Sequence, residues 1–520
     1  MLFNSLLFIF GFLPVTLAVT YGLGRRSQTA AKIALTLLSL GFYAYWRIQQ
    51  LPLLLFSIGF NFTLGVFIQR AQARERAGLV RGLLVFGILV DLAMLGWFKY
   101  ANFVVDNLDW AFGWKLRLAH IALPLAISFF TFQKLAYLID TTRGETKPVS
   151  LLDFSLFAAF FPQLIAGPIV HFKEVMPQLQ TRQFGRLIAR NLLVGLTIFA
   201  IGLFKKTVIA DTIADYANPL FARGHTGLHY GLASGWLAAI CFTFQVYFDF
   251  SAYSDMAIGL GRMLGVKLPL NFHSPLRATS IIDYWRRWHM TLQRFVVAYI
   301  FQPLSLPLNR LAAQWGLDGW GLFAVGVGIP IFVTFVAVGI WHGAGWTFVL
   351  YGVMQGAFIC INQAWRERSN AKRLKLRRAG LTQAPPGRLR IAAYLVLTLL
   401  AVLFSNVMFR ASSPSQAVEI WRGMIGLTGG AAGAYGAFDW TLFLTLAVSG
   451  AIVFLMPNTQ QIMGRFDPAW NWREWRDVAL APIRWTWRPS PAGLAFAAAA
   501  LFMGVMFIQR GRAVFLYFNF

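Results

Sequence analysis

Residues 319–361 read GWGLFAVGVGIPIFVTFVAVGIWHGAGWTFVLYGVMQGAFICI, and this stretch contains no Asp, Glu, Lys or Arg. At about 20 residues per helical span, it is long enough to cross a bilayer twice. His342 lies inside it, in the sequence Trp341-His342-Gly343. Ionisable side chains at membrane depth are costly, so a histidine found there is a candidate for a functional site.

Apolar runs like this one recur along most of the chain. Of its 520 residues, 58% are hydrophobic and 13% are charged, whereas soluble domains are about a quarter charged. The composition predicts an all-α polytopic membrane protein, with residues 1–520 forming a single membrane domain. The spacing of the runs predicts about 10 to 13 transmembrane or re-entrant helices. Pro and Gly interrupt the run at 161–168, which predicts a kinked or re-entrant helix there.

The net charge of +26 comes from basic residues that fall between the apolar runs. This distribution indicates positive-inside topology rather than a nucleic-acid partner. Basic residues after the first and third runs place the N-terminus outside. The strongest basic loop, 366–390, is expected on the cytoplasmic face in contact with anionic membrane lipid, with ligand binding as the alternative. The Gly- and Ala-rich loop 426–439 is expected to form a small external excursion.

The densest group of polar residues lies at 271–294 and includes a second histidine, His289. A continuous helix over 283–294 would place Trp285 and Trp288 on an aromatic side, and Arg286 and His289 on a cationic side. An interfacial helix anchored by Trp and Arg would explain this pattern. The alternative is a helix that lines a cavity for an anionic substrate, where guanidinium groups would pair with phosphates. In that case Arg286, Arg287 and Arg294 would hold them.

Other polar residues in apolar runs have structural and functional interpretations. His342 alone fits a core residue as well as an active site, but Gly343 allows close approach and Trp341 supplies an aromatic wall. Asp249 and Asp255 could pair with the arginines near 286, and a structural ion pair is the commoner role for such acids. No metal-ligand spacing of Cys and His is present, and the two cysteines fit a core role.

Eight segments of the sequence resemble the membrane-bound O-acyltransferases, in the alginate O-acetyltransferase branch. The resemblance runs in the family's order over roughly positions 90–410. The matching segments are Gly96–Phe103, Leu123–Phe130, Phe161–Pro168, Tyr247–Asp255, Asn271–Phe272, Tyr284–His289, Gly339–Gly343 and Phe409–Arg410.

The resemblance implies a ring of tilted helices around a central tunnel, with His342 as the catalytic residue and His289 as a second polar group. The donor would be acetyl-CoA from the cytoplasm, a substrate rather than a permanently bound cofactor. Trp285, Trp341 and the three arginines are expected around this donor. In this branch the acetyl group passes to a periplasmic or membrane-anchored SGNH-hydrolase-like acetyltransferase, for O-acetylation of an exported polysaccharide such as alginate or cellulose. The expected location is the bacterial inner membrane.

The chemistry expected is acyl transfer from a thioester. His342 would act as general base toward a hydroxyl, or accept the acyl group as a nucleophile. His289 would orient the donor or stabilise the developing oxyanion. Two alternatives stay open. A membrane transporter would be expected to show an internal repeat, and none is apparent, whereas a non-catalytic scaffold of a polysaccharide synthase would not need its histidines.

Overall fold

The computed structural model describes residues 1–115, 118–222, 229–381, 385–428 and 439–508. Within these ranges the regular structure is entirely helical. The predicted all-α fold is therefore confirmed. The Gly- and Ala-rich loop expected at 426–439 lies mostly outside the described residues.

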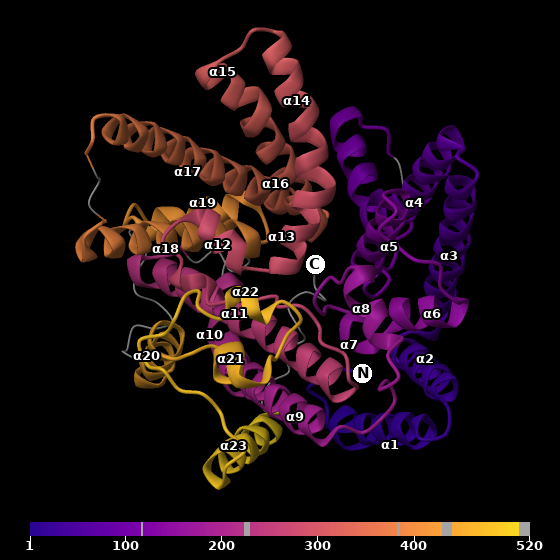
Figure 1. The fold of residues 1–520 in the computed structure, drawn as a ribbon. Coiled ribbons are helices and arrows are strands. Elements are labelled where there is room, and N and C mark those ends of the chain that lie inside the picture. The colour runs from indigo at the N-terminus through magenta and orange to yellow at the C-terminus, as the bar shows by residue number, and fades with distance from the viewer. Residues whose placement is uncertain (116–117, 223–228, 382–384, 429–438, 509–520) are drawn as a thin grey trace.

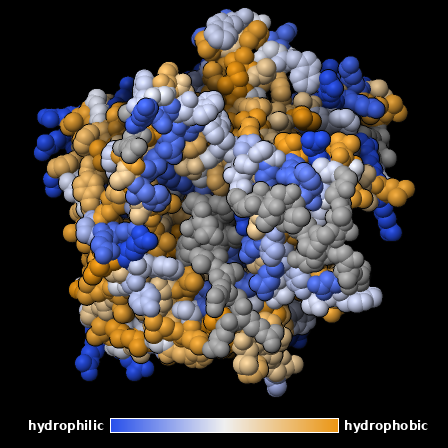
Figure 2. Space-filling model, turned by 180° about the vertical axis from the view of Figure 1, so that it is seen from behind, coloured by the Kyte–Doolittle hydropathy of each residue, from blue (hydrophilic) through white to orange (hydrophobic). Residues whose placement is uncertain are grey.

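Among the described residues, six helical stretches are long and apolar enough to cross a membrane. They are Leu7–Gly24, Ile48–Ala73, Ala77–Phe112, Ala189–Ala222, Gly319–His342 and Arg388–Arg410. Other predicted runs form helices that are shorter or contain more polar side chains. Hydrophobic side chains cover broad areas of the face shown in Figure 2, as lipid contact requires.

The N-terminal helices gather on one side of the molecule, coloured indigo to purple in Figure 1. They are α1 (Leu13–Gly24), α2 (Gln28–Ala44), α3 (Leu51–Ala73), α4 (Ala77–Phe112), α5 (Ile127–Thr142), α6 (Leu151–Ala159), α7 (Phe161–Leu164) and α8 (Phe172–Leu179). Helix α6 ends at Ala159, and the separate short helix α7 follows before the chain turns at Gly167. The break predicted in 161–168 is thus confirmed.

The central helices pack closely because small residues face one another. They are α9 (Ala189–Phe204), α10 (Asp211–Ala222), α11 (Leu232–Met263), α12 (Ile281–Arg287) and α13 (Met290–Val296). A Cβ atom built on Gly195 of α9 would lie 2.6 Å from the carbonyl oxygen of Gly259 in α11. Small residues let helix backbones approach in this way within membranes.

The helices on the other side carry the 319–361 stretch and are coloured pink to orange in Figure 1. They are α14 (Gln302–Gln314), α15 (Gly319–Phe323), α16 (Ile329–His342), α17 (Trp346–Arg378), α18 (Arg388–Arg410) and α19 (Pro414–Met424). Helices α16 and α17 form a hairpin whose turn follows His342. Helix α17 continues to Arg378, so most of the segment predicted as the basic loop 366–390 is helical.

The C-terminal helices lie at the lower edge of Figure 1 or across the central helices. They are α20 (Trp440–Leu455), α21 (Thr459–Ile462), α22 (Trp472–Trp475) and α23 (Pro491–Phe507). Short π- or 3₁₀-helical pieces join or extend several helices. They are Leu7–Phe12, Ile48–Gln50, Lys205–Ala210, Pro275–Arg277, Val297–Phe301, Ala324–Gly328 and Gly464–Phe466.

Candidate active site

The helix predicted over 283–294 is broken at His289, so this prediction was wrong in its continuity. Helix α12 ends at Arg287 and α13 begins at Met290, while His289 has a left-handed backbone with φ 43° and ψ 52°. This conformation is strained for a residue with a Cβ atom, and it persists where surrounding contacts hold it. The segment at 271–273 supplies these contacts. His273 N–H donates to the carbonyl of Arg287 (3.0 Å), and Met290 N–H donates to that of Asn271 (2.9 Å).

The side chain of Asn271 fixes the orientation of the His289 ring. Its Oδ1 atom accepts from the backbone N–H of Thr291 (3.3 Å) and from the Thr291 hydroxyl (2.9 Å). The same oxygen lies 3.0 Å from Nδ1 of His289. Because an amide oxygen only accepts, Nδ1 of His289 must be the protonated donor. The neutral imidazole therefore has Nε2 as its acceptor nitrogen.

His342 is the last residue of α16, and it is buried among aromatic side chains. Its ring centroid lies 5.0 Å from that of Phe409 and 6.1 Å from that of Tyr351. Only 4% of the residue is exposed. A Cβ atom on Gly343 would collide with the ring of Phe348, so a larger residue directly after the histidine would displace this ring. This confirms that Gly343 permits close approach, here by a side chain of α17.

Trp341 lies close to both histidines and links them into one site. Its ring centroid is 6.0 Å from that of His289 and 4.8 Å from that of His342. Phe132 stacks on the same indole at 5.5 Å. The Nε1 atom of Trp341 is buried and has no hydrogen-bond partner among the described residues. An indole N–H is a donor only, so this buried donor is available to an acceptor atom of a ligand.

Helix α4 holds the end of α16 through two residues of the Gly96–Phe103 motif, Lys99 and Tyr100. Tyr100 donates its hydroxyl to the carbonyl of Ile340 (2.9 Å). Lys99 donates from Nζ to the carbonyls of Trp341 and His342. The last carbonyls of a helix lack partners within it, and a cation is favoured there. Their place within the Gly96–Phe103 motif was the available signal for both residues.

The three arginines expected around the donor have different surroundings. Arg287 forms an ion pair with Asp283 (2.6 Å), and Arg294 pairs with Glu174 (2.5 Å). Arg286 is exposed and forms no ion pair with the described residues. Trp285, expected near the donor, is buried and donates from Nε1 to Oε1 of Gln355 in α17 (3.0 Å). Of this group, only Arg286 is left with an exposed and unpaired charge.

Asp249 and Asp255 do not pair with the arginines near 286, so that expectation was wrong. Asp249 pairs with Lys206 (2.7 Å), and Asp255 pairs with Lys205 (2.8 Å). The lysines lie in the π-helical segment Lys205–Ala210, which packs directly against α11. These buried carboxylates form ion pairs with a neighbouring helix, the structural role that was the commoner expectation.

His273 anchors the segment that carries Asn271. Its Nε2 donates to the carbonyl of Val478 (2.8 Å), and its Nδ1 accepts from Nδ2 of Asn458 (3.3 Å). Burial lowers the pKa of His273 to about 4, although its hydrogen bond to Val478 opposes this shift. The neutral ring matches both hydrogen bonds. Within the described part of the chain, no three His, Cys, Asp or Glu side chains are grouped as a metal site would require.

The sequence is similar to known acyltransferases. The model of the membrane-bound O-acyltransferase family matches residues 88–316. A peptidoglycan O-acetyltransferase of Helicobacter pylori is 38% identical over 82% of this chain and 80% of its own length. A probable alginate O-acetylase of Pseudomonas aeruginosa is 37% identical over 82% of this chain and 75% of its own. A teichoic acid D-alanyltransferase of Streptococcus thermophilus is 25% identical over 55% of this chain and 68% of its own.

Proposed function

Because this chain belongs to the membrane-bound O-acyltransferase family, we propose that it transfers an acetyl group from acetyl-CoA at the site around Trp341. The chain is a membrane-embedded acyltransferase. The identity of the donor and acceptor, the direction of transfer and the roles of the residues are proposed here. A single structural observation supports them. Two histidines 53 residues apart in sequence lie against a single buried indole whose N–H has no partner among the described residues.

His342 is the proposed general base. It takes the proton of the acceptor hydroxyl while the hydroxyl oxygen attacks the thioester carbonyl carbon. The tetrahedral oxyanion then collapses and the C–S bond breaks. The thiolate leaves, and the proton stays on His342. If His342 is instead the nucleophile, the acetyl group passes through an acetyl-imidazole that the hydroxyl then attacks. Detection of an acetylated His342 peptide after rapid quenching distinguishes the second route.

Trp341 suits oxyanion stabilisation better than His289 does. A preorganised donor aimed at the developing negative charge lowers the barrier, and the buried N–H of Trp341 is such a donor. In the neutral tautomer set by Asn271, Nε2 of His289 carries no proton and can only accept a hydrogen bond. His289 is therefore assigned to orienting the substrates, by accepting from the hydroxyl or from an amide N–H of the donor.

The proposed donor enters from the cytoplasm, where Arg286 offers its exposed charge to the phosphates of acetyl-CoA. The proposed acceptor lies on the other side of a bacterial inner membrane, at the far end of a tunnel. An SGNH-hydrolase-like acetyltransferase in the periplasm is proposed to receive the acetyl group and complete O-acetylation of an exported polysaccharide. The names of the relatives, peptidoglycan O-acetyltransferase and probable alginate O-acetylase, support a polymer acceptor. They also favour an enzyme over a transporter or a scaffold.

The test compares His342→Ala with a histidine control in proteoliposomes supplied with labelled acetyl-CoA. We expect His342→Ala to lower acetyl transfer by at least about 100-fold, the range for loss of a general base. His229→Ala is the matched control, since His229 is exposed and pairs with Glu419 away from the site. Equal activity of the two variants, at equal protein levels and thermal stability, would refute the assignment.

A further inference from the structure

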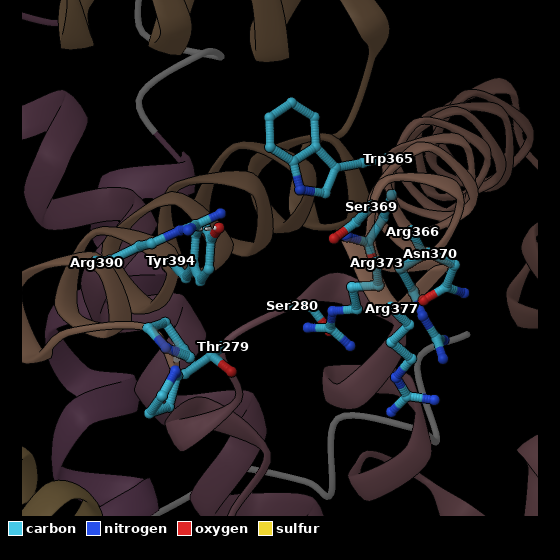
Figure 3. Close-up of a pocket in the computed structure, with 13 residues that line it drawn as sticks. Thr279, Ser280, Trp365, Arg366, Ser369, Asn370, Arg373, Arg377, Arg390 and Tyr394 are labelled. Atoms are coloured by element: carbon cyan, nitrogen blue, oxygen red, sulfur yellow. Dashed lines mark hydrogen bonds between the residues drawn. The ribbon is translucent and has the colours of Figure 1, made fainter. Parts of the chain in front are cut away.

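A polar cavity of about 600 Å³ lies between the basic ends of α17 and α18 (Figure 3). Its walls also include Thr279 and Ser280, directly before α12, and Pro385 and Pro386, directly before α18. The volume falls within the roughly 300–1,000 Å³ of small-molecule sites. None of the residues assigned to acyl transfer lines this cavity.

The basic residues of α17 divide between the cavity and the surface outside it. Arg366, Arg373 and Arg377 line the cavity, with Ser369 and Asn370 between them. Their spacing of seven and four residues places them on one face of a helix. Four other basic residues of the same helix do not line the cavity, namely Arg368, Lys372, Lys375 and Arg378. Positive-inside topology explains why this end of α17 carries many basic residues. It does not explain why three of them line the cavity while four do not.

A fourth guanidinium faces the cavity from α18. Arg390 donates from Nε to the hydroxyl of Tyr394 (2.6 Å), and its guanidinium carbon lies 5.4 Å from the centroid of that ring. Tyr394 therefore orients Arg390 without neutralising it. No Asp or Glu is among the lining residues that the structure describes, and Arg366, Arg377 and Arg390 form no ion pair with any described residue. The cavity is thus positively charged, which selects for an anion.

We propose that this cavity binds an anionic phosphate ester. Guanidinium groups match phosphate oxygens in paired hydrogen bonds, and two helices supply four of them. Ser369, Asn370 and Ser280 add neutral polar groups at the same walls. The ligand is either a soluble phosphorylated cofactor such as coenzyme A or the headgroup of an anionic lipid. Both present the same phosphate chemistry.

The inference goes beyond acyl transfer at His342 and stands without it, because it rests on a separate cavity. A connection between the two sites is nevertheless built into the chain. Ser280 is the N-cap of α12, accepting from the backbone N–H of Asp283 (3.1 Å). The helix then ends at Arg287, two residues before His289. A ligand in the cavity would therefore contact the segment that leads directly into the acyl-transfer site.

The test uses the full chain in nanodiscs of phosphatidylcholine, with two probes. Binding of coenzyme A is measured by equilibrium dialysis, and retention of added phosphatidylglycerol is measured by native mass spectrometry. The double variant Arg373→Gln with Arg377→Gln should lose at least about tenfold in affinity for one probe, because two sets of charge-assisted hydrogen bonds are removed. The probe that is lost identifies the source of the phosphate.

The matched control is Lys372→Gln with Arg378→Gln, which removes the same two charges from the same helix outside the cavity. It should bind both probes as the unchanged chain does. A third variant, Arg373→Lys with Arg377→Lys, keeps the charge but loses the paired geometry, and should bind with intermediate affinity. Equal binding of both probes by the two Gln double variants would overturn the proposal, and unchanged thermal unfolding shows that all variants are folded. Activity at His342 is not part of the readout, so failure here leaves the proposed function intact.

Discussion

Nδ1 of His289 lies 3.0 Å from Oδ1 of Asn271, and this contact joins a residue of unusual backbone geometry to its anchor. The same oxygen binds the hydroxyl and the backbone N–H of Thr291. Asn271 thus fixes both the left-handed turn at His289 and the tautomer of its ring.

Replacing Asn271 by Ala should lower kcat for acetyl transfer. Without the amide oxygen, the buried donors of Thr291 and His289 are left unpaired, which costs about 1–3 kcal/mol. If this cost falls on the transition state, kcat drops roughly 5- to 150-fold. Asn61→Ala is the control, because Asn61 is also fully buried and hydrogen-bonded but contacts Asp91 instead. Steady-state kinetics in proteoliposomes should show the drop for Asn271→Ala alone. Similar losses for both variants would contradict the positioning role.

Replacing Trp341 by Phe keeps an aromatic ring but removes the buried N–H together with one of the two fused indole rings, and the control Trp236→Phe loses the same volume. Loss of one donor to an oxyanion costs about 100- to 1,000-fold in kcat, so kcat should fall while KM changes little. Trp236→Phe removes an indole N–H that donates to the carbonyl of Met424, away from both histidines. An unchanged kcat for Trp341→Phe would remove this residue from the proposed mechanism.

Lys99 should act as a positioning residue for His342. In Lys99→Met, the carbonyls at the end of α16 lose their cation, and the imidazole is held less firmly. We expect a lower kcat with a nearly constant KM for acetyl-CoA, and partial recovery in Lys99→Arg, which restores a cation. Measurement of kcat and KM for the two variants checks this. A rise in KM alone would show that Lys99 binds donor rather than positioning the histidine.

His273 should make the protein less stable as the pH falls from about 6.5 to about 4. Burial lowers its pKa to about 4 in the folded state, against 6.5 when unperturbed. Between these values the unfolded chain takes up a proton that the folded chain does not, so stability falls with pH. Thermal unfolding followed by tryptophan fluorescence should show a smaller drop for His273→Gln, whose amide does not titrate. An equal drop in both proteins would exclude His273 as the cause.

The sequence predicted much of the site because the residues concerned are chemically out of place. A histidine within 43 residues that lack charged side chains is visible without a structure. The helical fold follows from the length of the apolar runs. The continuous helix over 283–294 was the natural expectation from spacing, yet it was wrong. The hydrogen bonds at this break join Arg287 and Met290 to His273 and Asn271 of a separate segment, and spacing within one segment does not reveal a partner from another.

The sequence also did not predict which basic side chain pairs with each buried acid. Asp249 and Asp255 lie in a motif near the arginines in the chain order, but their cations come from Lys205 and Lys206 of the neighbouring π-helical segment. Arg294 is neutralised by Glu174 of α8, whereas the Asp283–Arg287 pair spans four residues of one helix, a spacing visible in the sequence. Charge complementarity predicts that buried acids have partners, but it does not say which basic residue is close enough.

By itself, the sequence determined that this chain is an all-α membrane protein with two histidines of functional interest. Hydrophobicity and the cost of burying ionisable groups act residue by residue, so they can be read along the chain. The folded structure was needed to show that both histidines share the Trp341 indole, that Asn271 sets the tautomer of His289, and that Lys99 caps α16. These relationships depend on the direction of hydrogen bonds and on the approach of helices far apart in sequence, which only the packing of the folded chain defines.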